Sequence, residues 1–421
     1  MSDWVRIPLD ELVDVIDPHP SHRAPDAVVQ GIPFIGIGDI REDGSLIEGK
    51  GRIVSEKIFD EHIQRYQISD RTIGFGRVAT IGKVISFQNP TTKFVVSPTM
   101  AVLEPKPGTN RDFILHALRS EDIQEQIDKL LTGSTRSSLG IELLRKLTIL
   151  HPATAVAQKI SKVLNSVSNQ IDATQALIDK YTAIKQGMMA DLFSRGIDPE
   201  TKALRPTFEE APELYHETPL GMLPKGWDVV ELQTVATVER GKFTHRPRDD
   251  KRCFGGGYPF IQTGDVAACV GNHLTQYKQT LSDFGRSVSK EFPVGTVAVT
   301  IAANIADTAI LAMPMCFPDS VVGVVVDERL SSSRFVELCI RMSKPKLDAL
   351  APQSAQKNIN LEDLRPLKLP FPSRVEQELV CSSYEAINDP INSLINEKKK
   401  LIAQKSGLMQ DLLTGKVPVP A

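Results

Sequence analysis

The 421-residue sequence lacks several features that mark particular classes of protein. Its five cysteines include no Cys-x-x-Cys pair, so the spacing indicates neither a zinc site nor a disulfide framework, and it suits a reducing cytoplasm. The most apolar stretch, residues 294–317, carries Asn304, Asp307 and two prolines, which favours buried strands over a membrane span. We therefore expect a cytoplasmic protein that binds no metal and does not enter a membrane.

The chain also has little excess charge of either sign, since its net charge is −3 and its isoelectric point lies near 6.3. This argues against indiscriminate binding of nucleic acid but is compatible with a localised basic surface.

The catalytic motifs in the sequence are incomplete. Residues 34–38, Phe-Ile-Gly-Ile-Gly, fit a pattern that approaches S-adenosylmethionine, but the related stretch 260–264 lacks the middle glycine and no Asn-Pro-Pro-aromatic tetrapeptide occurs. Residues 76–83 depart from the P-loop spacing. We predict no catalytic residue and no cofactor bound by this chain.

A long apolar pattern occurs twice, 220 residues apart. Between residues 160 and 192, and again between 380 and 412, apolar side chains recur in alternating steps of four and three, the 3.5-residue period of a coiled-coil seam. Lys185 and Lys405 interrupt the two copies at the same place. The predicted apolar seam residues are Ile160, Leu164, Val167, Ile171, Ile178, Tyr181, Met188, Leu192, Val380, Tyr384, Ile387, Ile391, Leu394, Leu401, Leu408 and Leu412.

These two segments predict long helices that pack against each other, since an apolar stripe must be covered and its own copy is the nearest complement. The alternative is two separate core helices, each packed within its own domain. Pro390 is expected to kink or restart the second helix, because proline removes a helix hydrogen bond.

The repeat extends to most of the chain. The only two tryptophans, Trp4 and Trp227, open the two halves, and related Pro-Phe-Ile turns follow at 32–40 and 258–266. So long a period indicates domain duplication. The predicted fold class is α/β (α+β), with two duplicated mixed domains separated by two long antiparallel coiled-coil spacer helices. The predicted segments are a domain at 1–151, a helix at 152–195, a linker at 196–226, a domain at 227–371, a helix at 372–415 and a tail at 416–421.

The second half carries a basic loop at residues 240–252, in which Phe243 stands among arginines and lysines. Such side chains neutralise phosphates and read base edges, although a solvated loop held by salt bridges is the alternative. A polar cluster at 353–358 matches 134–138 in the first half. The predicted nucleic-acid contacts here are Arg240, Lys242, His245, Arg246, Arg248, Gln356, Lys357 and Asn358.

Taken together, these features resemble the specificity subunit of a type I restriction–modification system. The resemblance rests on the opening tryptophan, the Pro-Phe-Ile-x-x-Gly-Asp turn, the Ser-Ala-Gln-Lys-Asn-Ile-Asn loop, the Gly-x-Met-x-Asp-Leu helix ends and the duplicated order. It implies a non-catalytic chain with two target-recognition domains, each reading half of a split site in double-stranded DNA. It also implies two methyltransferase subunits that bring S-adenosylmethionine, and restriction subunits that bring translocation driven by ATP and Mg²⁺.

Tandem copies joined by an antiparallel helix pair are expected to be related by a pseudo-two-fold axis, as the strands of duplex DNA are. Because the two domains differ in sequence, their half-sites are expected to differ. The first half has no basic loop, and its predicted DNA contacts are Arg71, Arg77, Lys83 and Arg136.

Two other functions stay open at this point, a self-contained methyltransferase–nuclease and a coiled-coil scaffold without a DNA role. Salt-dependent binding to duplex DNA distinguishes the scaffold.

Overall fold

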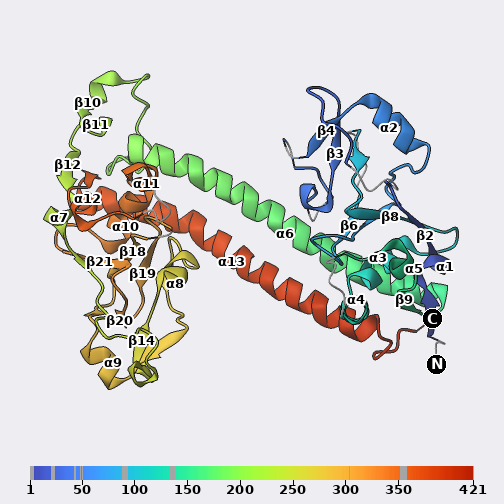
Figure 1. Ribbon diagram of the computed structural model, residues 1–421. Helices are drawn as coiled ribbons and strands as arrows, with labels where there is room; N and C mark the ends of the chain where they lie inside the picture. Colours follow the sequence, from blue (N-terminus) through green and yellow to red (C-terminus); the bar gives the residue numbers. More distant parts are fainter. Residues whose placement is uncertain are drawn as a thin grey trace. The chain divides into compact units, whose positions relative to one another are not determined.

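The computed structural model of the chain describes residues 4–19, 24–41, 44–47, 49, 51–87, 93–132, 138–302, 304–350 and 358–420 (Figure 1). The chain divides into two compact units, residues 1–179 with 393–421 and residues 180–392. Each unit holds one mixed domain and half of each long helix. In the part of the chain described, no helix combines the length and apolar character needed to cross a membrane.

The first domain, residues 4–151, contains two small sheets and a set of short helices. The larger sheet has the antiparallel order β2 (Val13–Ile16), β8 (Met100–Pro105), β5 (Ile73–Gly76), β6 (Val84–Ser86). The smaller sheet has the order β4 (Arg52–Val54), β3 (Ile32–Ile35), β7 (Val95–Val96). A separate pair joins the two ends of the domain, β1 (Val5–Pro8) and β9 (Thr148–His151). The helices are α1 (Leu9–Leu12), η1 (Ile37–Asp39), α2 (Glu56–Ile63), α3 (Arg111–Leu118), α4 (Glu121–Leu131) and α5 (Ile141–Arg145).

The second domain, residues 227–371, repeats this order with additions. Its larger sheet is β13 (Ala236–Arg240), β21 (Val321–Val326), β18 (Val297–Thr300), β19 (Thr308–Leu311), β15 (His273–Leu274). Its smaller sheet is β16 (Gln279–Leu281), β14 (Phe254–Phe260), β20 (Met315–Cys316), β17 (Glu291–Phe292). The pair that joins its ends is β12 (Asp228–Glu231) and β22 (Lys368–Phe371). The helices are α7 (Leu232–Val235), η3 (Lys251–Cys253), α8 (Thr263–Ala267), α9 (Asp283–Ser287), α10 (Ser333–Met342), α11 (Lys344–Leu350) and α12 (Leu361–Leu364).

The duplication is visible in single hydrogen bonds. In the first domain the Arg145 guanidinium donates from NH2 to the Val15 carbonyl at 3.1 Å. In the second domain Arg365 donates from NH2 to the Val238 carbonyl, also at 3.1 Å. Arg145 is the last residue of α5 and Arg365 directly follows α12, and each holds the first strand of the larger sheet, so the two domains share one internal frame. The predicted mixed fold class with two repeated domains and two long helices is confirmed.

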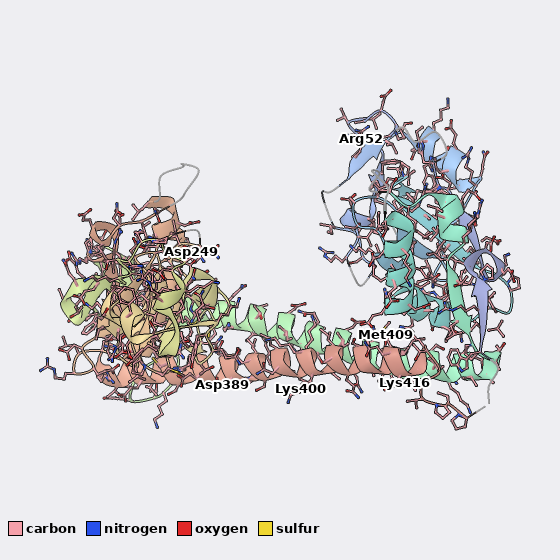
Figure 2. All side chains as sticks on the ribbon, turned by 60° about the horizontal axis from the view of Figure 1, so that its bottom comes forward. Arg52, Asp249, Asp389, Lys400, Met409 and Lys416 are labelled. Atoms are coloured by element: carbon pink, nitrogen blue, oxygen red, sulfur yellow. The ribbon has the colours of Figure 1, made fainter. Side chains whose placement is uncertain are left out.

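Helices α6 (Thr154–Ser194) and α13 (Arg374–Leu412) run side by side within each unit (Figure 1). Every predicted seam residue is buried or half-buried. In the second unit Lys185 Nζ donates to Asn388 Oδ1 at 3.1 Å, while Leu192 shares a buried cluster with Val380. Residue numbers thus rise along one helix as they fall along the other, which makes the pair antiparallel in this unit. Asp389 and Lys400, labelled in Figure 2, lie on exposed positions of α13.

Helix α13 continues through Pro390, so it does not restart there, and the kink expected as the alternative stays a prediction. Proline at this position leaves the carbonyl of residue 386 without its helical partner. Both Ala386 and Pro390 are exposed, so water can satisfy that carbonyl. The interruption by Lys185 is likewise accommodated, because its ammonium group has an amide acceptor and lies 5.8 Å from the centre of the Tyr384 ring.

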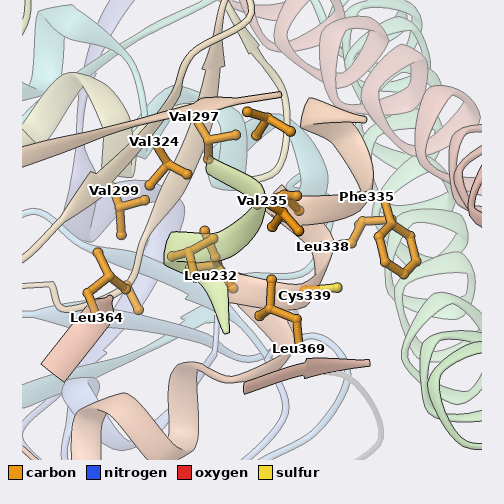
Figure 3. Close-up of a cluster of buried hydrophobic side chains, with 14 of the residues drawn as sticks. Leu232, Val235, Val297, Val299, Val324, Phe335, Leu338, Cys339, Leu364 and Leu369 are labelled. Atoms are coloured by element: carbon orange, nitrogen blue, oxygen red, sulfur yellow. The ribbon is translucent and has the colours of Figure 1, made fainter. Parts of the chain in front are cut away.

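The ends of the long helices are part of the domain cores. In the second unit, valines of β18 and β21 pack against α7, α10, α12 and β22, as Figure 3 shows. Leu192 of α6 and Tyr384 of α13 belong to the same buried cluster. In the first unit, Ile160, Leu164 and Leu412 are buried in the corresponding cluster with the first domain. Each domain therefore closes its core on the helix pair.

Residues 196–226, predicted as a linker without regular structure, are partly ordered into a hairpin of β10 (Tyr215–Thr218) and β11 (Gly221–Pro224). The start of this segment is fixed to α13. Arg205 forms an ion pair with Glu376, whose side chain is 3% exposed, and the Ile197 amide donates to the same carboxylate at 2.9 Å. The segment is thus a structural part of the second unit.

We predict that Arg205→Met destabilises the second unit by about 3 kcal/mol, because it leaves the buried Glu376 carboxylate without its counter-charge. The matched control is Arg374→Met, which breaks an ion pair to Glu378 whose side chains are 39% and 62% exposed, and which should cost at most about 1 kcal/mol. Denaturant unfolding is followed by Trp227 fluorescence in a Trp4→Phe background. Equal losses in the two variants would contradict a structural role for the Arg205 pair.

Candidate nucleic-acid interface

The Pro-Phe-Ile-x-x-Gly-Asp turn of each domain is a helix cap. In the first domain the Gly36 amide donates to Asp39 Oδ2 at 2.8 Å, and in the second the Gln262 amide donates to Asp265 Oδ2 at 2.8 Å. The turn follows the strand that lies inside the smaller sheet, β3 or β14. The run at 34–38 thus forms the end of β3 and the start of η1, with a cap that Gln262 also makes without a glycine. The same fixed position carries Gly36 in one domain and Gln262 in the other.

The basic loop leaves β13 and returns at β14 in the second domain. Its arginines have partners within the domain. Arg246 donates from NH1 to the carbonyls of Phe243 at 3.0 Å and His245 at 2.8 Å. Arg248 lies 3.2 Å from Asp319, with both side chains more than half exposed. Figure 2 labels Asp249, the next residue of this loop.

Acidic residues neutralise part of the loop. The Asp250 carboxylate accepts from Arg252 NH2 at 2.7 Å and lies 2.8 Å from His245 Nε2. Hydrogen bonds from Arg252, followed by that from His245, hold the pKa of Asp250 well below its ordinary value. Lys242 is exposed, and no ion pair of Lys242 or Lys251 is found in the described part of the chain. In the described residues, the exposed cations of the loop that no carboxylate pairs are Arg240, Lys242, Arg246 and Lys251.

Aromatic rings and cations are interleaved near the loop. The Arg252 guanidinium lies 5.5 Å from the centre of the Phe284 ring, and Arg286 lies 4.4 Å from the centre of the Tyr258 ring. Phe284 is 42% exposed. Exposed aromatic faces with cations are suited to nucleic-acid bases and their phosphates. Tyr258, Phe284 and Arg286 were not predicted, because their pairing depends on a fold that brings β14 beside α9.

A cavity of about 640 Å³ opens beside the loop. Phe243, Phe254 and Phe260 form its aromatic wall, with ring centres 5.3 to 6.1 Å apart. Gln262 and Gln279 line another side, and Gln262 Nε2 donates to Gln279 Oε1 at 2.7 Å. The cavity therefore combines an apolar wall with a small number of polar groups, as ligand sites commonly do.

The predicted contacts of the first domain are held more tightly than expected. The Arg77 side chain is 9% exposed and donates from Nε to the Leu139 carbonyl at 3.0 Å. Lys83 Nζ donates to the carbonyls of Ile37 at 3.0 Å and Ile40 at 3.2 Å. These contacts tie loops of the domain together, and the DNA contacts that the sequence predicts for Arg77 and Lys83 stay predictions. Arg71 is about half exposed and lies 3.9 Å from Glu104.

The paired polar loops lie mostly outside the described residues, and so do Arg136, Gln356 and Lys357. Their ends are anchored alike. Asn358 is exposed and forms an isolated bridge with Ala302, and Ser138 forms the corresponding bridge with Val78. Arg240 of the basic loop donates from Nη2 to Asn360 Oδ1 at 3.1 Å, which places Asn360, two residues after the second polar loop, beside the basic loop.

Comparison with known proteins gives a consistent result. The family model of the type I restriction modification DNA specificity domain matches residues 1–182 and 224–404. The chain is 24% identical to a putative type I restriction enzyme MjaX specificity subunit of Methanocaldococcus jannaschii, over 99% of this chain and 94% of that protein. It is 25% identical to the MjaVIII specificity subunit of the same organism, over 78% of this chain and 75% of that protein.

Solved structures show the same fold. A crystal structure of the S subunit of a type I restriction–modification system from M. genitalium matches with a TM-score of 0.61 at 13% identity, covering 100% of this chain and 97% of that one. A chain from a study of assembly and conformational transition of the type I R-M system matches with a TM-score of 0.51 at 15% identity, covering 97% of each.

We predict that Arg248→Ala weakens recognition of one half-site only, by about 1–3 kcal/mol for an arginine that reads a base edge. The matched control is Arg329→Ala, which removes another exposed arginine of the same unit that pairs with a neighbouring aspartate, Asp327. Binding is measured to duplexes with substitutions in either half-site. A uniform loss with unchanged sequence preference would place Arg248 on a phosphate.

Proposed function

Because the chain belongs to the type I restriction modification DNA specificity family, we propose that its two domains each read one half of a split DNA site. As the specificity subunit it is non-catalytic, and it acts in DNA recognition together with the other subunits of the system. The observation that carries the proposal is that the two domains share one internal framework but present different side chains at their surfaces. The arginine anchors and the capped turns repeat, whereas the exposed side chains around them do not.

Different surfaces on one frame support two different half-sites. The second domain has the basic loop, the aromatic–cation pairs and the cavity. In the first domain, Gly36 stands where the second has Gln262, and a Cβ at Gly36 would lie 3.0 Å from Thr99 Oγ1 and 3.3 Å from Ser97 Oγ. A side chain there would require both hydroxyl groups to move. Base contacts in the first half-site therefore come from other positions than in the second.

Two equivalent units also support two methyltransferase partners, one for each. In this assembly S-adenosylmethionine belongs to the methyltransferase subunits, and ATP with Mg²⁺ belongs to the restriction subunits. This chain supplies DNA recognition and the surfaces on which the methyltransferase subunits dock.

The purified chain is expected to transfer no methyl group from S-adenosylmethionine to DNA, because its sequence contains no Asn-Pro-Pro-aromatic motif to hold a target base. Sequence-specific methylation should appear when the modification subunit is added. Incorporation of labelled methyl groups into a plasmid library measures both states, with the modification subunit alone as the control. Methyl transfer by the isolated chain would contradict the proposed role.

The gap between the half-sites is expected to follow the length of α6 and α13, which pass from one unit to the other as continuous helices. Inserting four residues after Asp179 and four after Asn392 lengthens the helices by about 6 Å, at 1.5 Å per residue. Duplex DNA rises about 3.4 Å per base pair, so the gap should grow by one or two base pairs.

Genome-wide methylation mapping compares this variant with the parent chain. The control is a four-residue insertion after Pro219, in the turn between β10 and β11, which leaves both long helices unchanged. The half-site sequences should stay the same in both variants. An unchanged gap in an active helix-insertion variant would show that these helices do not set the spacing.

A further inference from the structure

We propose that the cavity beside residues 240–252 receives a single nucleobase that has left the base stack of the DNA bound by the second domain. The inference rests on the proposed DNA-binding function and names a site for it. At about 640 Å³, the cavity lies within the size range of small-molecule sites in proteins. Its walls supply the three kinds of contact that an unstacked nucleotide requires.

The first contact is stacking. Phe243 and Phe260 are buried and form a compact aromatic cluster with the half-buried Phe254. The Phe243 ring centre lies 5.3 Å from that of Phe260 and 5.9 Å from that of Phe254. A wall that is already packed loses little freedom when a base lies against it. Every base has an aromatic face, so this wall provides affinity for a base without choosing between bases.

The second contact is with the edge of the base. Gln262 and Gln279 both line the cavity, and Gln262 Nε2 donates to Gln279 Oε1 at 2.7 Å. Each carboxamide offers a donor and an acceptor, the combination that pairs with the adjacent acceptor and donor on a base edge. Gln262 stands on the capped turn fixed by Asp265, and Gln279 begins β16. The two amides are therefore held on rigid backbone, which suits selection among bases.

The third contact is with the sugar–phosphate backbone. Arg248 and Lys251 both line the cavity and provide two positive charges, against one negative charge from Asp249. The Arg248 ion pair with Asp319 is exposed, so a phosphate can replace the aspartate at little cost. A positively charged rim above an aromatic wall fits a nucleotide that remains attached to its strand.

The corresponding place in the first domain is built differently. There His19 lies beside Phe34, the counterpart of Phe260, with ring centres 6.0 Å apart. Gly36 stands at the position of Gln262, so no amide extends from that turn. Base extrusion by this chain is therefore expected in the half-site of the second domain and not in that of the first.

Opposite-strand mismatches test this. A mismatch weakens the base pair that must open, so it should tighten binding by about tenfold at a position whose base enters the cavity. The complex of the full chain with its methyltransferase subunits is titrated with duplexes that carry one mismatch at a time across both half-sites. The methylated bases are identified separately by mapping and set aside, since methyltransferases also extrude their target base.

Two variants assign the effect to the cavity. Gln262→Ala removes an edge contact, and Phe254→Leu keeps apolar bulk while removing the aromatic face. In both, the tightening in the second half-site should be lost, and binding of duplexes altered in the first half-site should be unchanged. Arg329→Ala is the control that retains the tightening.

Sequence-specific binding with no mismatch that tightens it, or tightening that persists in both variants, would overturn the inference while leaving the proposed function intact. Loss of sequence-specific binding in the parent complex would instead overturn the proposed function. If deoxynucleoside monophosphates bind at the cavity and the mismatch scan is flat, the cavity is a site for free nucleotides and not for a base of bound DNA.

Discussion

The structure depends on the burial of one repeated apolar seam. Neither long helix can expose its stripe to water, and within each unit the stripe is covered both by the other helix and by the mixed domain. Ile160 and Leu164 of α6, for example, belong to the same buried cluster as the strands of the first domain. The recognition surfaces are consequently mounted on elements that the core itself holds in place, a requirement for contacts that must meet base edges at defined positions.

The polar parts of the structure divide into frame and surface. Arginines with backbone carbonyl partners, such as Arg145 and Arg365, hold strands in place, and Arg77 does the same between loops. Arg252 and Arg286, which lie over the Phe284 and Tyr258 rings, instead have side chains that are 73% and 47% exposed. Arginine occurs in both roles, so the residue type does not distinguish them. The hydrogen-bond partner does, because a backbone carbonyl in the interior fixes a guanidinium that would otherwise be free to bind water or phosphate.

Sequence reasoning succeeded where the signal was local or repeated. The seam period, the repeated order and the related Pro-Phe-Ile turns at 32–40 and 258–266 could be recognised from the sequence alone. It could not identify partners that lie far away in the sequence. Arg77 is fixed by Leu139, 62 residues away, and the segment 196–226 is fixed by Glu376, 179 residues from Ile197. Tyr258 and Arg286 likewise meet only after the strands have paired. The sequence revealed a basic loop, but it did not show that Asp250 pairs with Arg252 and His245, or that Asp319 pairs with Arg248.

The two tryptophans have a consequence for the connectivity of the chain. Gly196 lies against Trp227 where α6 leads into the second domain, and Gly415 lies against Trp4 where α13 ends beside the first strand of the first domain. Each long helix thus ends against the tryptophan that opens a domain. The chain connects Gly196 to Trp227 through residues 197–226, whereas no peptide connects Gly415 to Trp4. In its connectivity, the chain is close to a closed cycle of two related segments. Opening the chain in the turn near Pro219 and joining residue 420 to residue 4 through a short peptide should give a circular permutant that keeps both cores.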